Sequence, residues 1–410
     1  MAILYAALQV PELRDNMRSI DGGICAVRGV QAAGIKLSKM GLALIVAKGS
    51  AAGVYTRNKV IAAPLVVTRE KIKRSKELAA VIANSGNANA FTGEKGIADA
   101  RQMCRMVAGE LGVDEALVAV ASTGVIGRSL DMGWLEDHVS EVVDGLTDTA
   151  EGGKMAARAI MTTDTVEKVS VVELDNGVRI GGIAKGSGMI EPNMGTILGF
   201  IYTDASLPAD VLDACLHKSV DISFNMVVVD GDTSTNDMVL LTANGASGIE
   251  PDIEQFQQGL DQVLTDLARQ VAGDGEGATK LIETRVRGAR TRNDARIIAK
   301  AVVRSPLVKS AVFGRDPNWG RVMAAVGYSG ADVDQDGLSL AFSNGDDTVR
   351  LVDNGTIVAE DAQTLEHLGT IMDNDKVVIM VDIDLGDDTA VAWGCDLTYD
   401  YVRINAEYTT

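Results

Sequence analysis

Paired turn signals between short apolar segments constrain the fold more than any other feature of this chain. Asn176 and Gly177 separate VSVVELD from VRIGGIA, and Asn354 and Gly355 separate TVRLVD from TIVAED. Asn-Gly pairs are typical of type I′ hairpin turns, because these turns require positive φ at two successive residues. Each pair therefore predicts an antiparallel hairpin.

Other segments show the periodicity of buried strands or amphipathic helices. Apolar runs predict strands at 42–47, 224–230, 238–242 and 377–382. Asp252 is a suitable N-cap for a helix that should end at Gly273 and bury one stripe, comprising Phe256, Leu260, Val263, Leu264, Leu267 and Val271. Further helices are expected at 99–111 and 293–303. Hairpins combined with such helices predict an α+β fold, a layered α/β sandwich with antiparallel sheets, rather than a doubly wound parallel sheet.

Composition narrows the class of protein. The chain has 38 Lys and Arg against 57 Asp and Glu, for a net charge of -19. A surface this acidic repels phosphate backbones, so we expect no nucleic-acid partner. The four cysteines are far apart and favour a reducing cytoplasm over a disulfide framework. The N-terminal segment lacks the features of a signal peptide, and no apolar run is long enough to predict a membrane span.

Familiar catalytic and metal-binding patterns are absent from the sequence. The three histidines do not form H-E-x-x-H, and there is no G-x-S-x-G. GDGEGATK at 273–280 resembles a phosphate loop but lacks the G-K-[ST] order. DGDTSTND at 230–237 resembles a calcium loop without its glycine and glutamate, and leaves a magnesium site at Asp230 and Asp232 as a minor alternative. We therefore expect no metal, and a surface position for His217.

The segment KGSGMIEPNMGTILGFIYTDA, residues 185–205, carries the most distinctive chemistry. Thr196 lies between Gly195 and an apolar run, which is also how an ordinary buried strand begins. The alternative is a self-cleaving bond, in which the Thr196 hydroxyl attacks the Gly195 carbonyl and forms an ester. Hydrolysis would free an α-amine with a reference pKa of about 7.7–8.0, and this amine could act as the base for its own hydroxyl.

Eight segments in order resemble the ornithine acetyltransferase family, whose bifunctional members are glutamate N-acetyltransferases and amino-acid acetyltransferases of arginine biosynthesis. These are NSGNANAFTG, ASTGVIG, AIMTTDT, KGSGMIEPNMGT, VVDGDTSTND, GDGEGATK, FGRDPNWGR and CDLTYDYVRINAEYTT. The resemblance implies an autoprocessed, N-terminal-nucleophile-like architecture with an α chain, 1–195, and a β chain, 196–410. It also implies a heterotetramer of two α and two β chains, which transfers acetyl from N-acetylornithine to glutamate through an acetyl-threonine.

The resemblance also implies roles for individual residues. Thr196 matches the nucleophile, and Thr123 and Gly124 match the oxyanion hole. The matching substrate-binding positions are Thr162, Lys185, Thr196, Glu276, Asn405 and Thr410. Many members have alanine before the threonine, where this chain has Gly195. No cofactor is implied, and acetyl-CoA is left open as a second acetyl donor.

Two other functions compete with this interpretation. An aminopeptidase or amidohydrolase of similar architecture would use water in place of glutamate, and an uncut chain would be a non-enzymatic binding protein.

The C-terminal segment DLTYDYVRI is expected to be a strand that runs up to the last residues at the substrate site.

Overall fold

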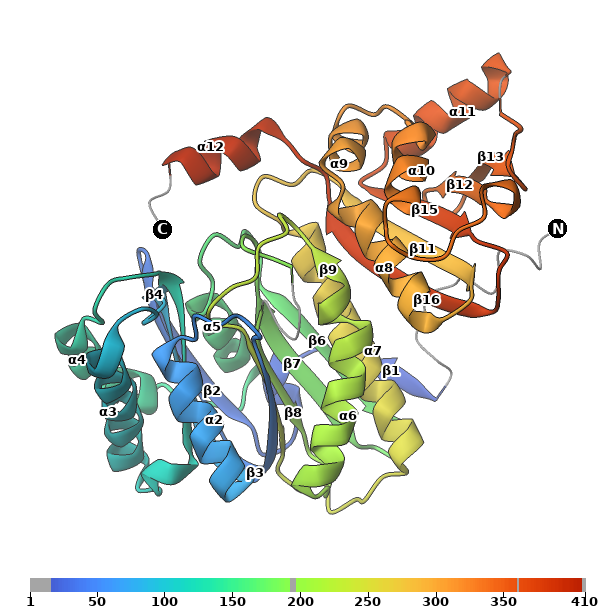
Figure 1. The fold of residues 1–410 in the computed structure, drawn as a ribbon. Helices are drawn as coiled ribbons and strands as arrows, with labels where there is room; N and C mark the ends of the chain where they lie inside the picture. The colour runs from blue at the N-terminus through green and yellow to red at the C-terminus, as the bar shows by residue number, and fades with distance from the viewer. Residues whose placement is uncertain (1–15, 192–196, 360, 408–410) are drawn as a thin grey trace. The chain divides into compact units, whose positions relative to one another are not determined.

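A computed structural model describes residues 16–191, 197–359 and 361–407 (Figure 1). Within these ranges the chain forms two compact units. The larger contains residues 16–225 and 232–267, and the smaller contains 226–231 and 268–407. The proposed cleavage point therefore does not coincide with the division into units, because residues on both sides of 195 belong to the larger one.

A nine-stranded sheet organises the larger unit, in the order β1-β6-β7-β8-β10-β3-β4-β5 with β2 paired to β3. Its strands are β1 (Met17–Ser19), β2 (Gln31–Leu37), β3 (Met40–Tyr55), β4 (Glu77–Asn87), β5 (Val118–Val125), β6 (Lys168–Leu174), β7 (Arg179–Lys185), β8 (Leu198–Thr203) and β10 (Met238–Ala243). Its helices are α2 (Ala63–Ser75), α3 (Gly93–Leu111), α4 (Met132–Asp144), α5 (Ala150–Ala159) and α6 (Ala209–Ile222). Helix α7 (Ile253–Gly273) begins in this unit and extends beyond residue 267. The short helices are η1 (Gly23–Ala26), η2 (Glu115–Leu117) and η3 (Phe224–Met226).

The long strand β3 joins two halves of this sheet. Its first part pairs with β2 and β4, and its last part pairs with β10. A single apolar cluster contains side chains from β4 and β5 together with side chains from β7, β8 and β10, so the two halves pack face to face. Helices α3 and α4 cover the outer face of one half, and α6 packs on β3 and β10 of the other (Figure 1). The α+β layered class is therefore confirmed.

The smaller unit contains a seven-stranded sheet in the order β14-β13-β12-β15-β11-β16-β9. Its strands are β9 (Val227–Val228), β11 (Leu281–Ala289), β12 (Ser339–Ser343), β13 (Thr348–Asp353), β14 (Thr356–Ile357), β15 (Lys376–Asp382) and β16 (Asp388–Cys395). Its helices are α8 (Arg292–Arg304), α9 (Pro306–Phe313), α10 (Trp319–Gly327), α11 (Ala362–Met372), α12 (Tyr399–Glu407) and the short η4 (Gln335–Gly337). No helix in the described ranges is both long and apolar enough to span a membrane.

The strongly periodic elements lie where the sequence predicts them. Asp252 accepts hydrogen bonds from the backbone N–H groups of Glu254 and Gln255, and every residue of the predicted α7 stripe is fully buried. His217 lies on α6 with a half-exposed side chain, as expected. Both sheets also contain parallel pairs, such as β4 with β5 and β11 with β15, in addition to the predicted hairpins.

Both predicted hairpins form, but three local predictions are wrong: the type I′ turn at Asn176 and Gly177, the strand at 224–230 and the C-terminal strand. Asn354 and Gly355 both have positive φ, as a type I′ turn requires, but at the first hairpin this holds for Gly177 and not for Asn176. There the Gly177 N–H donates to Leu174 O, which gives a longer turn closed by the glycine. The 224–230 run forms η3 and then the two-residue β9, because it crosses between the two units.

The C-terminal segment is a helix, α12, and not the predicted strand. The Thr398 hydroxyl accepts a hydrogen bond from the Tyr401 N–H at 3.3 Å, which is the geometry of an N-cap. The aromatic and β-branched residues that suggested a strand are largely exposed, with Tyr399 at 84% and Val402 at 64%. Helix capping by Thr398 therefore determines the structure of this segment more than the β propensity of its residues does.

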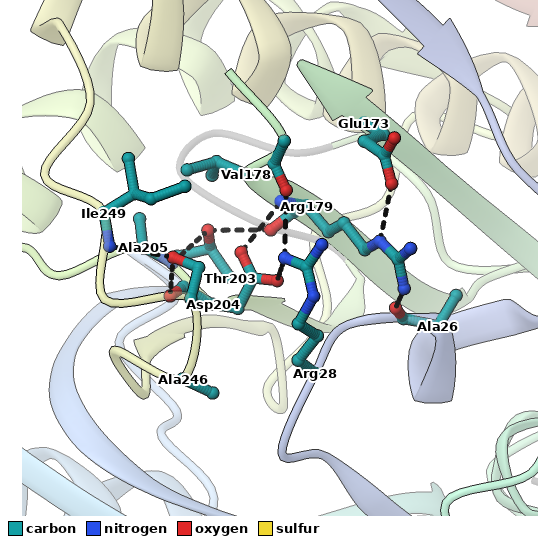
Figure 2. A network of polar contacts seen from close by, with 12 residues as sticks. Ala26, Arg28, Glu173, Val178, Arg179, Thr203, Asp204, Ala205, Ala246 and Ile249 are labelled. Atoms are coloured by element: carbon teal, nitrogen blue, oxygen red, sulfur yellow. Dashed lines mark hydrogen bonds and ion pairs between the residues drawn. The ribbon is translucent and has the colours of Figure 1, made fainter. Parts of the chain in front are cut away.

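A polar network fixes the register of β7 and β8 at the ends farthest from Lys185 and Leu198. The buried Asp204 carboxylate accepts hydrogen bonds from the Arg179 backbone N–H at 2.8 Å and from Arg28 Nη1 at 2.7 Å (Figure 2). Thr203 Oγ1 donates to Arg179 O at 2.8 Å. Because a slip by one residue would break these contacts and turn each side chain to the opposite face, the network favours one register.

We expect Asp204→Ala to lower the free energy of unfolding by about 1–3 kcal/mol, because Asp204 is fully buried and its loss leaves the Arg179 N–H without an acceptor. Asp21→Ala, at an exposed position, should change it by less than about 0.5 kcal/mol. Urea denaturation of both variants measures the difference. Equal stabilities would show that the network does not hold the register.

Candidate active site

Thr123 and Gly124 lie at the end of β5, where the backbone is held against β4. Gly124 has a φ of +129°, and a Cβ at this position would lie 2.4 Å from the carbonyl carbon of Gly86. Asn236 Nδ2 donates to Ser122 O at 2.8 Å, which ties this end of β5 to the loop before β10. The position thus requires glycine, and it holds the Thr123–Gly124 peptide rigidly, as an oxyanion hole needs.

The buried carboxylate of Asp164 brings together Thr162 and Lys185, two of the predicted substrate-binding residues. Asp164 Oδ2 accepts from the Thr162 N–H at 3.0 Å and lies 3.9 Å from Lys185 Nζ. Its other oxygen accepts from Lys168 Nζ at 2.8 Å and from the Gly186 N–H at 2.7 Å. Asp164 therefore connects the end of β7 to the segment after α5.

The charge state of Asp164 follows from these contacts. Burial alone would raise the pKa of its carboxyl, but the positive charges of Lys185 and Lys168 and the hydrogen bonds it accepts outweigh burial and lower the pKa. Asp164 is therefore an anion at neutral pH. Sequence reasoning missed it, although it stands within AIMTTDT, four residues before Lys168.

Asp237 is a second acid that sequence reasoning missed. It precedes β10, and its Oδ2 is buried with no hydrogen-bond partner among the described residues. Burial raises its pKa well above the ordinary value, although the nearby Lys185 and hydrogen bonds from Ser234 and Thr56 act in the opposite direction. The next residue, Met238, donates its N–H to Ile197 O at 2.9 Å, so Asp237 lies beside the first described residue after the 192–196 gap.

Three predicted site residues, Gly195, Thr196 and Thr410, lie outside the described residues. The strand that follows Thr196 is nevertheless well defined. Leu198 is paired with Lys185 of β7 on one side and with Met238 of β10 on the other. The predicted nucleophile is thus two residues before a buried, doubly paired strand position.

Glu276 and Asn405, which belong to the smaller unit, contact each other. Asn405 Nδ2 donates to Glu276 Oε2 at 2.8 Å. The loop that carries Glu276 packs against the start of α12, where a Cβ on Gly277 would lie 2.6 Å from the Tyr401 nitrogen. Thr398 Oγ1 also donates to Gly277 O at 2.7 Å. The structure therefore groups these two predicted substrate-binding residues, as it groups Thr162 and Lys185 in the larger unit.

Neither a metal site nor the pocket described next provides an alternative active site in the described part of the chain. No cluster of three or more His, Cys, Asp or Glu side chains is arranged to hold a metal ion in the described ranges. A pocket of about 860 Å³ between β3, α2 and α6 contains none of the predicted site residues. Its cations are exposed to water, and they are Arg57, Lys59, Arg69, Lys73 and Lys76.

Comparison with protein families identifies the chain. The model of the ArgJ family matches residues 27–410. The chain belongs to the ArgJ family.

Curated relatives agree with this assignment along almost the whole chain. A glutamate N-acetyltransferase from Methanosarcina mazei is 62% identical over 397 residues, covering 96% of this chain and 100% of the relative. An arginine biosynthesis bifunctional protein ArgJ from Archaeoglobus fulgidus is 49% identical, covering 94% of this chain and 100% of that protein. A solved structure of ArgJ from Bacillus halodurans is 42% identical with a TM-score of 0.48, covering 51% of this chain and 98% of that one.

Gly124→Ala should destabilise the protein more than Gly127→Ala. Both glycines have positive φ, which costs alanine roughly 1–2 kcal/mol, but a Cβ meets backbone atoms only at Gly124, since nothing lies within 4 Å of one at Gly127. Urea denaturation of the two variants measures the difference. Equal losses of stability would show that the close approach of β4 does not constrain this turn.

Proposed function

We propose that this ArgJ-family enzyme is a glutamate N-acetyltransferase of arginine biosynthesis, which moves acetyl from N-acetylornithine to glutamate through an acetyl-Thr196 intermediate. The observation that carries the proposal is the grouping of Thr162 and Lys185 around Asp164, at the end of β7 that pairs with the start of β8. A lysine and a backbone-anchored threonine suit the α-carboxylate that both amino acids share.

The proposed chemistry begins with cleavage of the chain. The Thr196 hydroxyl attacks the Gly195 carbonyl, the peptide nitrogen leaves as the Thr196 α-amine, and water hydrolyses the resulting ester. This leaves a Gly195 carboxylate and a free Thr196 hydroxyl. Thr123 and Gly124 stabilise the oxyanion of each tetrahedral species. No cofactor takes part.

Acetyl transfer then proceeds in two half-reactions. The Thr196 α-amine takes the hydroxyl proton as Oγ attacks the acetyl carbon of N-acetylornithine, and it returns the proton to the departing ornithine nitrogen. The neutral amine of glutamate then attacks the acetyl ester, the Thr196 α-amine takes a proton from the attacking nitrogen, and this proton passes to the departing Thr196 Oγ. Glu276, held by Asn405, pairs with the side-chain ammonium of ornithine, and Thr410 belongs to the same proposed substrate site.

Cleavage would give α chains of residues 1–195 and β chains of residues 196–410, and we propose that two of each assemble. The sheet supports lasting association, because β8 of the β chain is hydrogen-bonded to β7 of the α chain, and β10 to β3. We also propose a cytoplasmic location, which suits four buried, free cysteines.

Thr196→Ala should leave one uncut chain near 43.1 kDa and abolish transfer, because it removes the attacking oxygen. Gly195→Ala should still be cut, because it restores the alanine that many similar sequences have at this position. A denaturing gel and intact mass with N-acetylornithine report cleavage and the acetyl adduct. Efficient cleavage of Thr196→Ala would contradict the mechanism, and release of free acetate in place of N-acetylglutamate would favour the hydrolase alternative.

Glu276→Gln should raise the KM for N-acetylornithine by about 10–100-fold, because it removes the charge that pairs with the ammonium. Chain cleavage should be unaffected. Glu366→Gln, at an exposed position on α11, is the matched control and should leave KM unchanged. An unaltered KM in Glu276→Gln would remove Glu276 from the substrate site.

A further inference from the structure

Lys36, on β2, contacts residues that adjoin the predicted site residues Thr123 and Thr162. Its Nζ donates to Ser85 Oγ at 2.8 Å and also to the backbone oxygen of Met161. Ser85 is the strand partner of Thr123 across β4 and β5, and Met161 immediately precedes Thr162. Lys36 thus bonds to residues adjacent to both Thr123 and Thr162.

Positive charge exceeds negative charge around Lys36. The charged groups that shift its pKa are Asp164, which raises it, and Lys185, which lowers it. Asp164 also pairs with Lys168, so its charge is shared by Lys36, Lys185 and Lys168. Asp237, near Lys185, adds little negative charge because burial disfavours its ionised form. The anion that raises the pKa of Lys36 is therefore already engaged by other ammonium groups.

The hydrogen-bonding capacity of Lys36 is also incomplete. An ammonium has three N–H donors, and two are used by Ser85 and Met161. The side chain of Lys36 is half-buried, whereas Lys185 is 8% exposed. A carboxylate would supply an acceptor for the third donor and a negative charge beside it.

We infer that Lys36 acts with Lys185 as a second cationic ligand for a carboxylate of the amino-acid substrate. This inference rests on the proposed acetyl transfer and adds a residue to its substrate site. Burial lowers the pKa of Lys36 to about 8, so the side chain is mostly charged at neutral pH and loses its proton just above it. Carboxylate binding should therefore weaken as pH rises through this value.

The first test compares KM values at pH 7. Lys36→Met should raise the KM for N-acetylornithine by about 10–100-fold, which is the usual effect of losing one charge-assisted hydrogen bond. Lys48→Met removes an exposed lysine from β3 and should leave KM unchanged. Chain cleavage and melting temperature, measured on the same samples, identify a loss that comes from misfolding.

The second test uses the pH dependence of Lys36→Arg, whose guanidinium stays charged throughout the range. N-acetylornithine does not titrate between about pH 6.5 and about 9, since its α-nitrogen is acylated and its amine resembles that of lysine. KM of the wild type should therefore rise through about pH 8 relative to KM of Lys36→Arg. Titration of the Thr196 amine is common to both enzymes and cancels in the ratio.

The substrate carboxylate can be identified with glutamate analogues as acceptors. If Lys36 binds the α-carboxylate, Lys36→Met should affect glutamate but not γ-aminobutyrate, which lacks that group. Unchanged KM in Lys36→Met, or a wild type to Lys36→Arg ratio independent of pH, would overturn the inference. A wild-type enzyme that makes no N-acetylglutamate would instead overturn the proposed function, so the two failures are distinguishable.

Discussion

The hydrogen bonding of β8 between β7 and β10 is the constraint on which most of the structure depends. Every residue of β8 is buried, so a shift of register would expose apolar side chains and break two ladders. The observed register sets Leu198 opposite both Lys185 and Met238. Through these pairings, β8 determines which residues of β7 and β10 lie beside its first residue, Leu198.

This arrangement also explains how a chain could be cut without coming apart. Cleavage before Thr196 would break the connection between β7 and β8, but none of the ladder hydrogen bonds between them. The sheet interior, with β8 between β7 and β10, would be shared by both products. Because apolar burial and backbone pairing stabilise this sheet, separating the products would cost about as much as unfolding the larger unit.

Sequence reasoning succeeded where information is local. The stripe of α7, the Asp252 cap and both hairpins follow from spacing within one segment. It failed at α12, where one Thr398 hydroxyl bond outweighs strand-like composition. Prediction of the site shows the same division between local and distant information. The family motifs, which are local, predicted the substrate-binding positions. Asp164 and Lys36 also have partners distant in sequence, Lys185 for the first and Ser85 and Met161 for the second, and no local pattern reveals these contacts.

The electrostatic environment accounts for base catalysis without histidine in the proposed mechanism. A free α-amine has a pKa of about 7.7–8.0, so much of it would be protonated at neutral pH and unable to act as a base. In sequence the Thr196 amine precedes Leu198, the strand partner of Lys185. In the proposed mechanism, a lysine ammonium at the substrate site would disfavour protonation of the amine, and Asp237, whose pKa is raised by burial, would add little negative charge to oppose this effect. The lysines would therefore keep more of the amine in its neutral, proton-accepting form, and a substrate carboxylate that binds to them would reduce this effect.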